Sequence, residues 1–146
     1  EKDGERIVCP IHNGEEVLSV HMPGKEKLSE EAVDLAFEMA EDFFKRYYPE
    51  YRPRAYVCSS WLLNPELARF LPEDSNIMKF QKRFTLSRGP VNDFSLFHNI
   101  FDKPNPCPLE ELKPANRFQR EILQYVKDGG LLYSGRGFIL IREEEK

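Results

Sequence analysis

The sequence predicts one α+β domain with a central mixed, mostly antiparallel sheet and helices on both faces of that sheet. The chain has 146 residues, a length that suits a single domain, and its 11 Phe, 6 Tyr and 1 Trp can build a core. The apolar periodicities follow the order strand, helix, strand, two short helices, two strands, helix and two strands. Because this order combines helical crossovers with hairpin connections, a mixed sheet packed against helices is expected.

The N-terminal third predicts a strand followed by a long helix. In residues 16–22, Val, Ser and His alternate with Leu, Val and Met, a pattern that favours a strand. Ser29 is suited to cap the following helix, residues 29–48, with Leu28 and Val33 as a hydrophobic staple. The apolar stripe expected of this amphipathic helix consists of Ala32, Leu35, Ala36, Met39, Ala40, Phe43 and Tyr47.

The middle of the chain predicts an interior strand, two short helices and a hairpin. Residues 55–63 are apolar on both faces, as an interior strand is. Asn64 and Pro65 are typical of a helix start, and a second helix begins at residue 74 or 75. We expect residues 85–87 and 94–101 to pair as a hairpin that turns through Arg88, Gly89 and Pro90.

The last third predicts a loop, a helix and a second hairpin. Residues 102–114 are rich in proline and turn formers, and the helix that follows should end at Gly129 and Gly130. Residues 131–134 and 138–141 should form a closing hairpin around the Ser-Gly-Arg-Gly run.

Composition excludes several classes of protein. No apolar run approaches the roughly 20 residues of a bilayer span, and residues 1–6 are charged rather than typical of a secretory signal. Three scattered cysteines favour a reducing, cytoplasmic compartment over a disulfide framework. Residues 1–50 carry 6 basic and 13 acidic side chains, so a nucleic-acid partner is not expected. The one basic cluster, interpreted as a solvated helix face, comprises Lys79, Lys82, Arg83 and Arg88.

Metal binding is not predicted either. Cys9 and His12 have the spacing of half a zinc site, but a structural zinc needs four ligands and no second pair follows at a suitable distance in the sequence.

A set of motifs resembles a known family. These motifs are Cys58-Ser59-Ser60-Trp61-Leu62-Leu63 with Pro65, Leu71-Pro72, Ser75-Asn76-Ile77, Phe80-Gln81 with Arg83-Phe84, His21-Met22-Pro23-Gly24, and Phe43-Phe44 with Tyr48-Pro49. They are similar to the C-terminal, GNAT-like domain of bacterial acyltransferase-domain proteins, in which that domain follows an N-terminal acyltransferase domain. The similarity covers residues 15–101. Residues 1–14 are then a lead-in, and residues 102–146 a C-terminal loop, helix and hairpin.

The resemblance implies transfer of an acyl group from acyl-CoA, as a co-substrate rather than a tightly bound cofactor. The thioester arm would lie between strand 16–22 and strand 55–63, with the pyrophosphate at the start of helix 29–48. The residues expected to line this cofactor site are Pro23, Gly24, Lys25, Lys27, Ser29, Ser59, Trp61 and Asn76. The loop departs from the superfamily pattern, because it has one glycine and is followed by Glu30 and Glu31, which repel a phosphate.

Three residues are candidates for the chemistry. His21 could act as general base toward an attacking amine, or it could be a structural histidine. Cys58 and Ser60 share one face of their strand, and either could be a nucleophile or a proton donor to the leaving thiolate. The alternative for Cys58 is a buried core position. The alternative for Ser60 is a hydrogen bond to the backbone.

Two functions therefore remain open from the sequence. One is an acyl-CoA-dependent N-acyltransferase domain that acts on a small amine, with an upstream acyltransferase N-terminal domain as a partner. The other is a non-catalytic binding or scaffolding domain that retains the fold and needs an upstream domain or partner, which Glu30, Glu31 and the missing glycines favour.

Overall fold

The chain folds around one four-stranded mixed sheet. The structure, a computed structural model, describes residues 9–23 and 28–142. The sheet has the strand order β1-β2-β4-β3, in which β1 and β2 are parallel and the other two pairs are antiparallel. The strands are β1 (Val17–Ser19), β2 (Ala55–Ser60), β3 (Thr85–Val91) and β4 (Tyr133–Leu140). The mixed sheet with packed helices confirms the predicted fold class.

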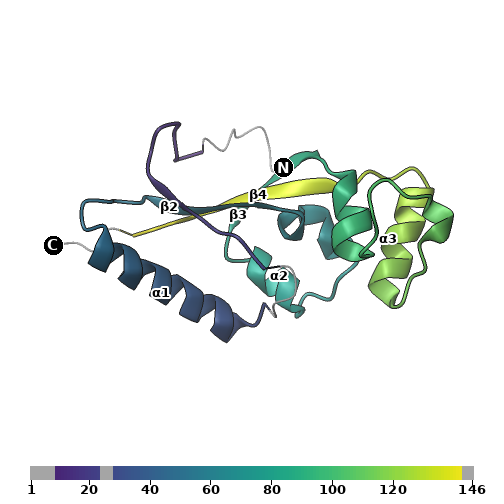
Figure 1. Ribbon diagram of the computed structural model, residues 1–146, viewed down its shortest axis with the longest axis horizontal. Coiled ribbons are helices and arrows are strands. Elements are labelled where there is room, and N and C mark those ends of the chain that lie inside the picture. Colours follow the sequence, from purple (N-terminus) through teal and green to yellow (C-terminus); the bar gives the residue numbers. More distant parts are fainter. Residues whose placement is uncertain (1–8, 24–27, 143–146) are drawn as a thin grey trace, which may run out of the picture.

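Three α-helices pack around this sheet. They are α1 (Glu30–Tyr47), α2 (Asn76–Gln81) and α3 (Arg117–Lys127), joined by the shorter helical segments η1 (Trp61–Leu63), η2 (Pro65–Arg69), η3 (Ser95–Ile100) and η4 (Leu109–Glu111). Figure 1 shows α1 and α2 on one side of the sheet and α3 beyond one end of it. On the opposite face, Ser19, Ser59 and Arg136 are exposed.

The described residues form two hydrophobic clusters. The first lies between α1, α2 and the sheet, and its buried members are Val33, Cys58, Leu63, Phe80 and Phe84. The second surrounds α3 and the helical segments near it, and its buried members are Leu67, Leu96, Phe97, Leu112, Ile122, Leu123 and Leu132. The expected capping also holds, since Ser29 Oγ accepts a hydrogen bond from Ala32 N and Ser75 Oγ accepts one from Met78 N.

The predicted closing hairpin is wrong. Residues 133–140 form one continuous strand, β4, which pairs with β2 on one side and β3 on the other. Its glycines serve close packing instead of a turn: a Cβ at Gly135 would collide with the carbonyl of Leu63, and one at Gly137 would lie 2.9 Å from Cβ of Phe84. A Gly-rich run in a strand can therefore resemble a turn in the sequence.

The predicted hairpin of residues 85–87 and 94–101 is also wrong. The strand β3 continues through Gly89 and Pro90, with an irregular register between Arg88 and Val91. Proline is tolerated there because β3 is an edge strand among the described residues. The segment expected as the second hairpin strand is mostly helical, and short apolar runs do not distinguish the two by periodicity.

The strand ends also differ from the prediction. Strand 16–22 is reduced to Val17–Ser19, and strand 55–63 ends at Ser60, after which residues 61–63 form one helical turn. Ser60 Oγ accepts a hydrogen bond from Leu62 N at 3.2 Å, which caps that turn. The strand thus ends where the Ser60 hydroxyl accepts the backbone N–H two residues further on.

Candidate functional site

The parallel strands β1 and β2 separate at a defined point. Their paired register ends at Ser19 and Val57, and the last hydrogen bond between them runs from Val20 N to the carbonyl of Val57 at 2.8 Å. The strand β2 continues to Ser60. Because alternate residues of a strand direct their backbone groups to the same edge, the N–H and carbonyl of Ser59 face the side that β1 has left. Among the described residues, the edge of β2 at Ser59 therefore has no partner strand.

His21 lies where β1 turns away from this edge. Its side chain is exposed, and Nε2 lies 3.1 Å from Oγ of Ser19. The alternation of side chains along the strand, and the contact with Ser19, place His21 on the face opposite α1. A solvent-accessible imidazole next to the free edge can accept a proton from an incoming group.

Cys58 lies on the other face, inside the core. It is buried against Leu63 and Phe80, and burial raises the pKa of its thiol. A thiol that is kept protonated and away from solvent is a poor nucleophile. The structure thus places the Cys58 thiol in the core between α1, α2 and the sheet.

Ser60 is half-buried at the end of β2. Its oxygen accepts the N–H of Leu62, so the hydroxyl hydrogen remains able to donate to another group. Ser60 and Cys58 share a strand face, as expected, but His21 is on the opposite face. The structure therefore does not bring the three candidate catalytic side chains together on one face.

Trp61 and Asn76 are two of the residues expected to line the cofactor site. Trp61 is half-buried and packs against the cluster around α3 instead of filling the space between β1 and β2. Asn76 is exposed at the first position of α2, where Ser75, not Asn76, is the cap.

The loop that precedes α1 is described only in part. Pro23 is exposed, whereas Gly24, Lys25 and Lys27 lie outside the described residues. Ser29 caps the helix through its 3.2 Å hydrogen bond from Ala32 N, so its oxygen is already occupied. The first turn of α1 nevertheless has the unpaired N–H groups that helix starts present to anions.

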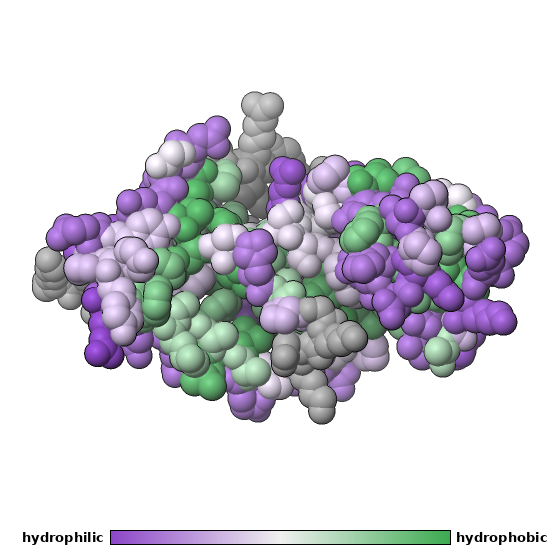
Figure 2. Space-filling view, in the orientation of Figure 1, coloured by the Kyte–Doolittle hydropathy of each residue, from purple (hydrophilic) through white to green (hydrophobic). Residues whose placement is uncertain are grey.

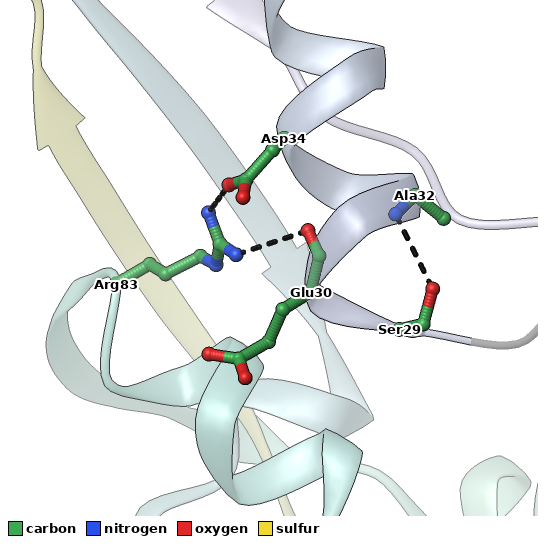
Figure 3. A network of polar contacts seen from close by, with 5 residues as sticks. All are labelled: Ser29, Glu30, Ala32, Asp34 and Arg83. Atoms are coloured by element: carbon green, nitrogen blue, oxygen red, sulfur yellow. Dashed lines mark hydrogen bonds and ion pairs between the residues drawn. The ribbon is translucent and has the colours of Figure 1, made fainter.

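Two cations from the neighbourhood of α2 offset the acidic start of α1, and Figure 3 shows one of them, Arg83. Arg83 Nη1 lies 2.5 Å from Oδ1 of Asp34, and Nη2 donates to the carbonyl of Glu30 at 3.3 Å. Lys79 Nζ donates to Oε2 of Glu30 at 3.1 Å. The sequence identified this basic cluster but not its location, because 49 residues separate Lys79 from Glu30. The positive charges of Lys79 and Arg83 therefore offset part of the negative charge near the first turn of α1.

Two cavities among the described residues lie away from the edge of β2 at Ser59. The larger has a volume of about 1030 Å³ and lies between the second half of α1 and the sheet, with Phe37, Phe44, Tyr56 and Ile139 in its wall. The smaller lies between Arg69 and Phe118. Neither is lined by His21 or Ser60. Within residues 9–23 and 28–142, no group of three or more His, Cys, Asp or Glu side chains is placed to hold a metal ion.

The sheet order, the separating parallel pair and the helix between its strands define an acyltransferase fold of the GNAT-like class. The chain belongs to the family of the GNAT-like C-terminal domain, whose profile matches residues 4–139. The expected family is confirmed. A search of curated protein sequences finds no match.

Solved acyltransferase structures are similar to this chain. An acyltransferase in complex with decanoyl-CoA aligns with a TM-score of 0.79 and 30% identity, over 90% of this chain and 42% of that chain. An acyltransferase in complex with CoA and 10C-teicoplanin aligns with a TM-score of 0.76 and 29% identity, over 86% of this chain and 41% of that chain. An acyltransferase in complex with decanoyl-CoA and teicoplanin aligns with a TM-score of 0.74 and 30% identity, over 85% of this chain and 40% of that chain. The chain thus spans about two fifths of these acyltransferases. No helix in the described part of the chain is long and apolar enough to cross a membrane.

Proposed function

We propose that this chain is the acyl-CoA-binding part of an acyltransferase, and that it transfers an acyl group from acyl-CoA to an amine. The observation that carries the proposal is the edge of β2 at Ser59, which has no partner strand among the described residues once β1 has separated. In similar solved structures, acyl-CoA or CoA is bound by acyltransferases of this fold.

The backbone of β2 suits the pantetheine arm. The N–H and carbonyl of Ser59 face the side that β1 has left, and an amide-containing chain can pair there as an added strand does. Such pairing needs backbone groups rather than particular side chains. The pyrophosphate would then meet the N–H groups at the start of α1, with Lys79 and Arg83 close by to offset its charge.

His21 and Ser60 are the two side chains to which we assign chemistry in the acyl transfer. The amine nitrogen attacks the thioester carbonyl, His21 takes a proton from that nitrogen, and the new C–N bond replaces the C–S bond. The leaving CoA thiolate accepts a hydrogen bond from the Ser60 hydroxyl, which remains able to donate, and takes its proton from water, while His21 returns the amine proton to water. Cys58 has no role in this scheme, because it is buried.

The acceptor is proposed at the level of its chemistry. A small primary amine is the simplest group that His21 could deprotonate. Two of the similar acyltransferases were crystallised with teicoplanin or an acylated form of it, so a glycopeptide amine is a second acceptor to test.

A second function, binding without catalysis, is favoured by one observation. Glu30 and Asp34 at the start of α1 are already paired with Lys79 and Arg83, so a phosphate would have to compete with carboxylates for these cations. A domain that keeps the fold but binds only a protein partner would show this arrangement too.

Calorimetric titration with decanoyl-CoA and CoA separates the two functions. Saturable binding is expected, and Arg83→Gln should weaken it while Arg120→Gln, an exposed arginine on α3, should not. His21→Ala should leave binding intact and lower acyl transfer by about 10²-fold, with His98→Ala as the matched control. Acyl transfer is measured as the release of the CoA thiol, with teicoplanin or a primary amine as the acceptor. Absence of binding at millimolar ligand would exclude the enzymatic proposal for this chain.

A further inference from the structure

The cavity of about 1030 Å³ between the second half of α1 and the sheet lies apart from the candidate site. Its floor is a row of residues on three adjacent strands, because Leu18 pairs with Tyr56 and Tyr56 pairs with Ile139. Phe37 and Phe44, which lie on one face of α1, line the opposite side. Figure 2 shows hydrophobic surface on the left of the molecule, over α1 and the adjoining strands. An apolar cavity of this size is typical of small-molecule sites, which commonly measure roughly 300–1,000 Å³.

The hydroxyl groups in the cavity wall already have hydrogen-bond partners. Tyr56 donates to Oε1 of Glu41 at 2.9 Å, and Tyr51 donates to the carbonyl of Val17 at 2.6 Å. A sugar or a nucleotide base in this space would bury polar atoms that need partners of their own, which is costly. The inner wall is therefore better suited to an alkyl chain.

The charged residues of the wall are mostly basic. Against one carboxylate, that of Glu41, the wall contains four cationic side chains: Lys45, Arg52, Arg54 and Arg142. Arg54 and Arg142 lie at the same end of the sheet, because Ile141 N donates to the carbonyl of Arg54 at 2.9 Å. This excess of positive charge favours an anionic ligand over a neutral or cationic one.

Arg142 is the wall cation best placed to bind that anion. Arg54 is already paired with Glu15. Arg142 is exposed, and its guanidinium makes no hydrogen bond or ion pair with another residue that the structure describes. A guanidinium presents a planar fork of N–H donors that matches a carboxylate.

We propose that this cavity binds a free fatty acid of medium chain length, with its alkyl chain between α1 and the sheet and its carboxylate at Arg142. The site is separate from the proposed acyl transfer, since neither His21 nor Ser60 lines the cavity. The acyl chain of an acyl-CoA has the same alkyl chemistry, so the experiment must distinguish the free acid from the thioester.

Titration with decanoate, followed by NMR of isoleucine methyl groups, tests the proposal. The Ile139 signal should shift saturably, with a Kd on the order of 0.1 mM, and should show nuclear Overhauser effects to the alkyl chain. Ile122, buried in the cluster around α3, should not shift. Decanol, which has the same alkyl chain without the charge, should bind about tenfold more weakly.

Two substitutions in the wall should act in opposite directions. Arg142→Gln removes the partner of the carboxylate and should weaken decanoate binding about fivefold, whereas Arg120→Gln, at an exposed position on α3, should not change it. Glu41→Gln removes a negative charge from the wall but keeps an acceptor for the Tyr56 hydroxyl, so it should strengthen binding about threefold. All three variants should keep the methyl spectrum of the folded chain.

Three results would overturn the proposal. In the first, Ile139 does not shift at millimolar decanoate. In the second, Arg142→Gln has no more effect than Arg120→Gln, or decanol binds as tightly as decanoate. In the third, CoA or decanoyl-CoA displaces decanoate, which would assign the cavity to the co-substrate. If the chain binds neither CoA nor decanoyl-CoA, the proposed acyl transfer fails while decanoate binding can still be measured.

Discussion

The hydroxyl of Tyr56 donates a 2.9 Å hydrogen bond to Oε1 of Glu41, which ties the interior strand β2 to the middle of α1. The Tyr56 ring also stacks on Phe37, with ring centroids 4.5 Å apart. Burial first, and then the hydrogen bond and the charge of Glu41, raise the pKa of Tyr56. The contact holds α1 over the sheet.

Removing that hydroxyl should change the pH dependence of stability. Because the pKa of Tyr56 is higher in the folded than in the unfolded chain, its contribution is complete below about pH 10, the ordinary tyrosine pKa, and is lost as the pH rises above it. Tyr56→Phe should cost about 1 kcal/mol at pH 7 and make the loss of stability between pH 10 and 11 shallower. Urea unfolding across this range measures both effects. An equally steep loss in the variant would contradict the assignment to Tyr56.

Gln81 should be more sensitive to substitution than an exposed glutamine. Its buried amide Nε2 donates to the carbonyls of Leu62 at 2.7 Å and Asn64 at 2.9 Å, which joins α2 to the turn after β2. Gln81→Met leaves both carbonyls without this donor and should cost about 3 kcal/mol. The control Gln124→Met, at an exposed position on α3, should stay within about 0.5 kcal/mol. Chemical denaturation compares them, and similar losses would refute the role given to Gln81.

Gly135 should tolerate no side chain. A Cβ there would collide with the carbonyl of Leu63, which is backbone and cannot rotate away. Gly135→Ala should therefore cost about 3 kcal/mol or more. Gly129→Ala has open space and only the strain of its φ of +91°, so it should cost about 1–2 kcal/mol. Thermal unfolding of the two variants should keep this order; a reversed order would mean that the strand can move away from Leu63.

The three cysteines should differ in their reactivity. Cys9 is exposed, Cys107 is half-buried, and Cys58 is buried with a raised thiol pKa. Alkylation with iodoacetamide at pH 8, followed by mass spectrometry, should therefore modify Cys9 first and Cys58 only after unfolding. Cys58→Ala should also retain any acyl transfer that the chain performs. Fast labelling of native Cys58, or loss of transfer in Cys58→Ala, would restore its candidacy as a nucleophile.

Part of the candidate site could be predicted from the sequence. The Ser29 cap, the alternation that places Ser19 and His21 on one face, and the interior strand that follows all depend on local rules. The location of Lys79 and Arg83 at the start of α1 could not be predicted, because it depends on how α2 packs. The surroundings of Trp61 could not be predicted either, because the strand expected to reach residue 63 ends at Ser60 and the indole packs against the cluster around α3.

The sequence by itself determined the elements whose signals are local: the helix caps at Ser29 and Ser75, and the long helix that follows Ser29. Only the tertiary structure decided how glycines and apolar rows are used. Gly135 permits close packing because Leu63 lies against it, and Leu35 and Met39 of α1 are exposed because the helix directs Val33 and Phe37 to the core instead. Turn propensity and amphipathic period describe a residue's own backbone and side chain. What lies opposite that residue is set by segments far away in the sequence.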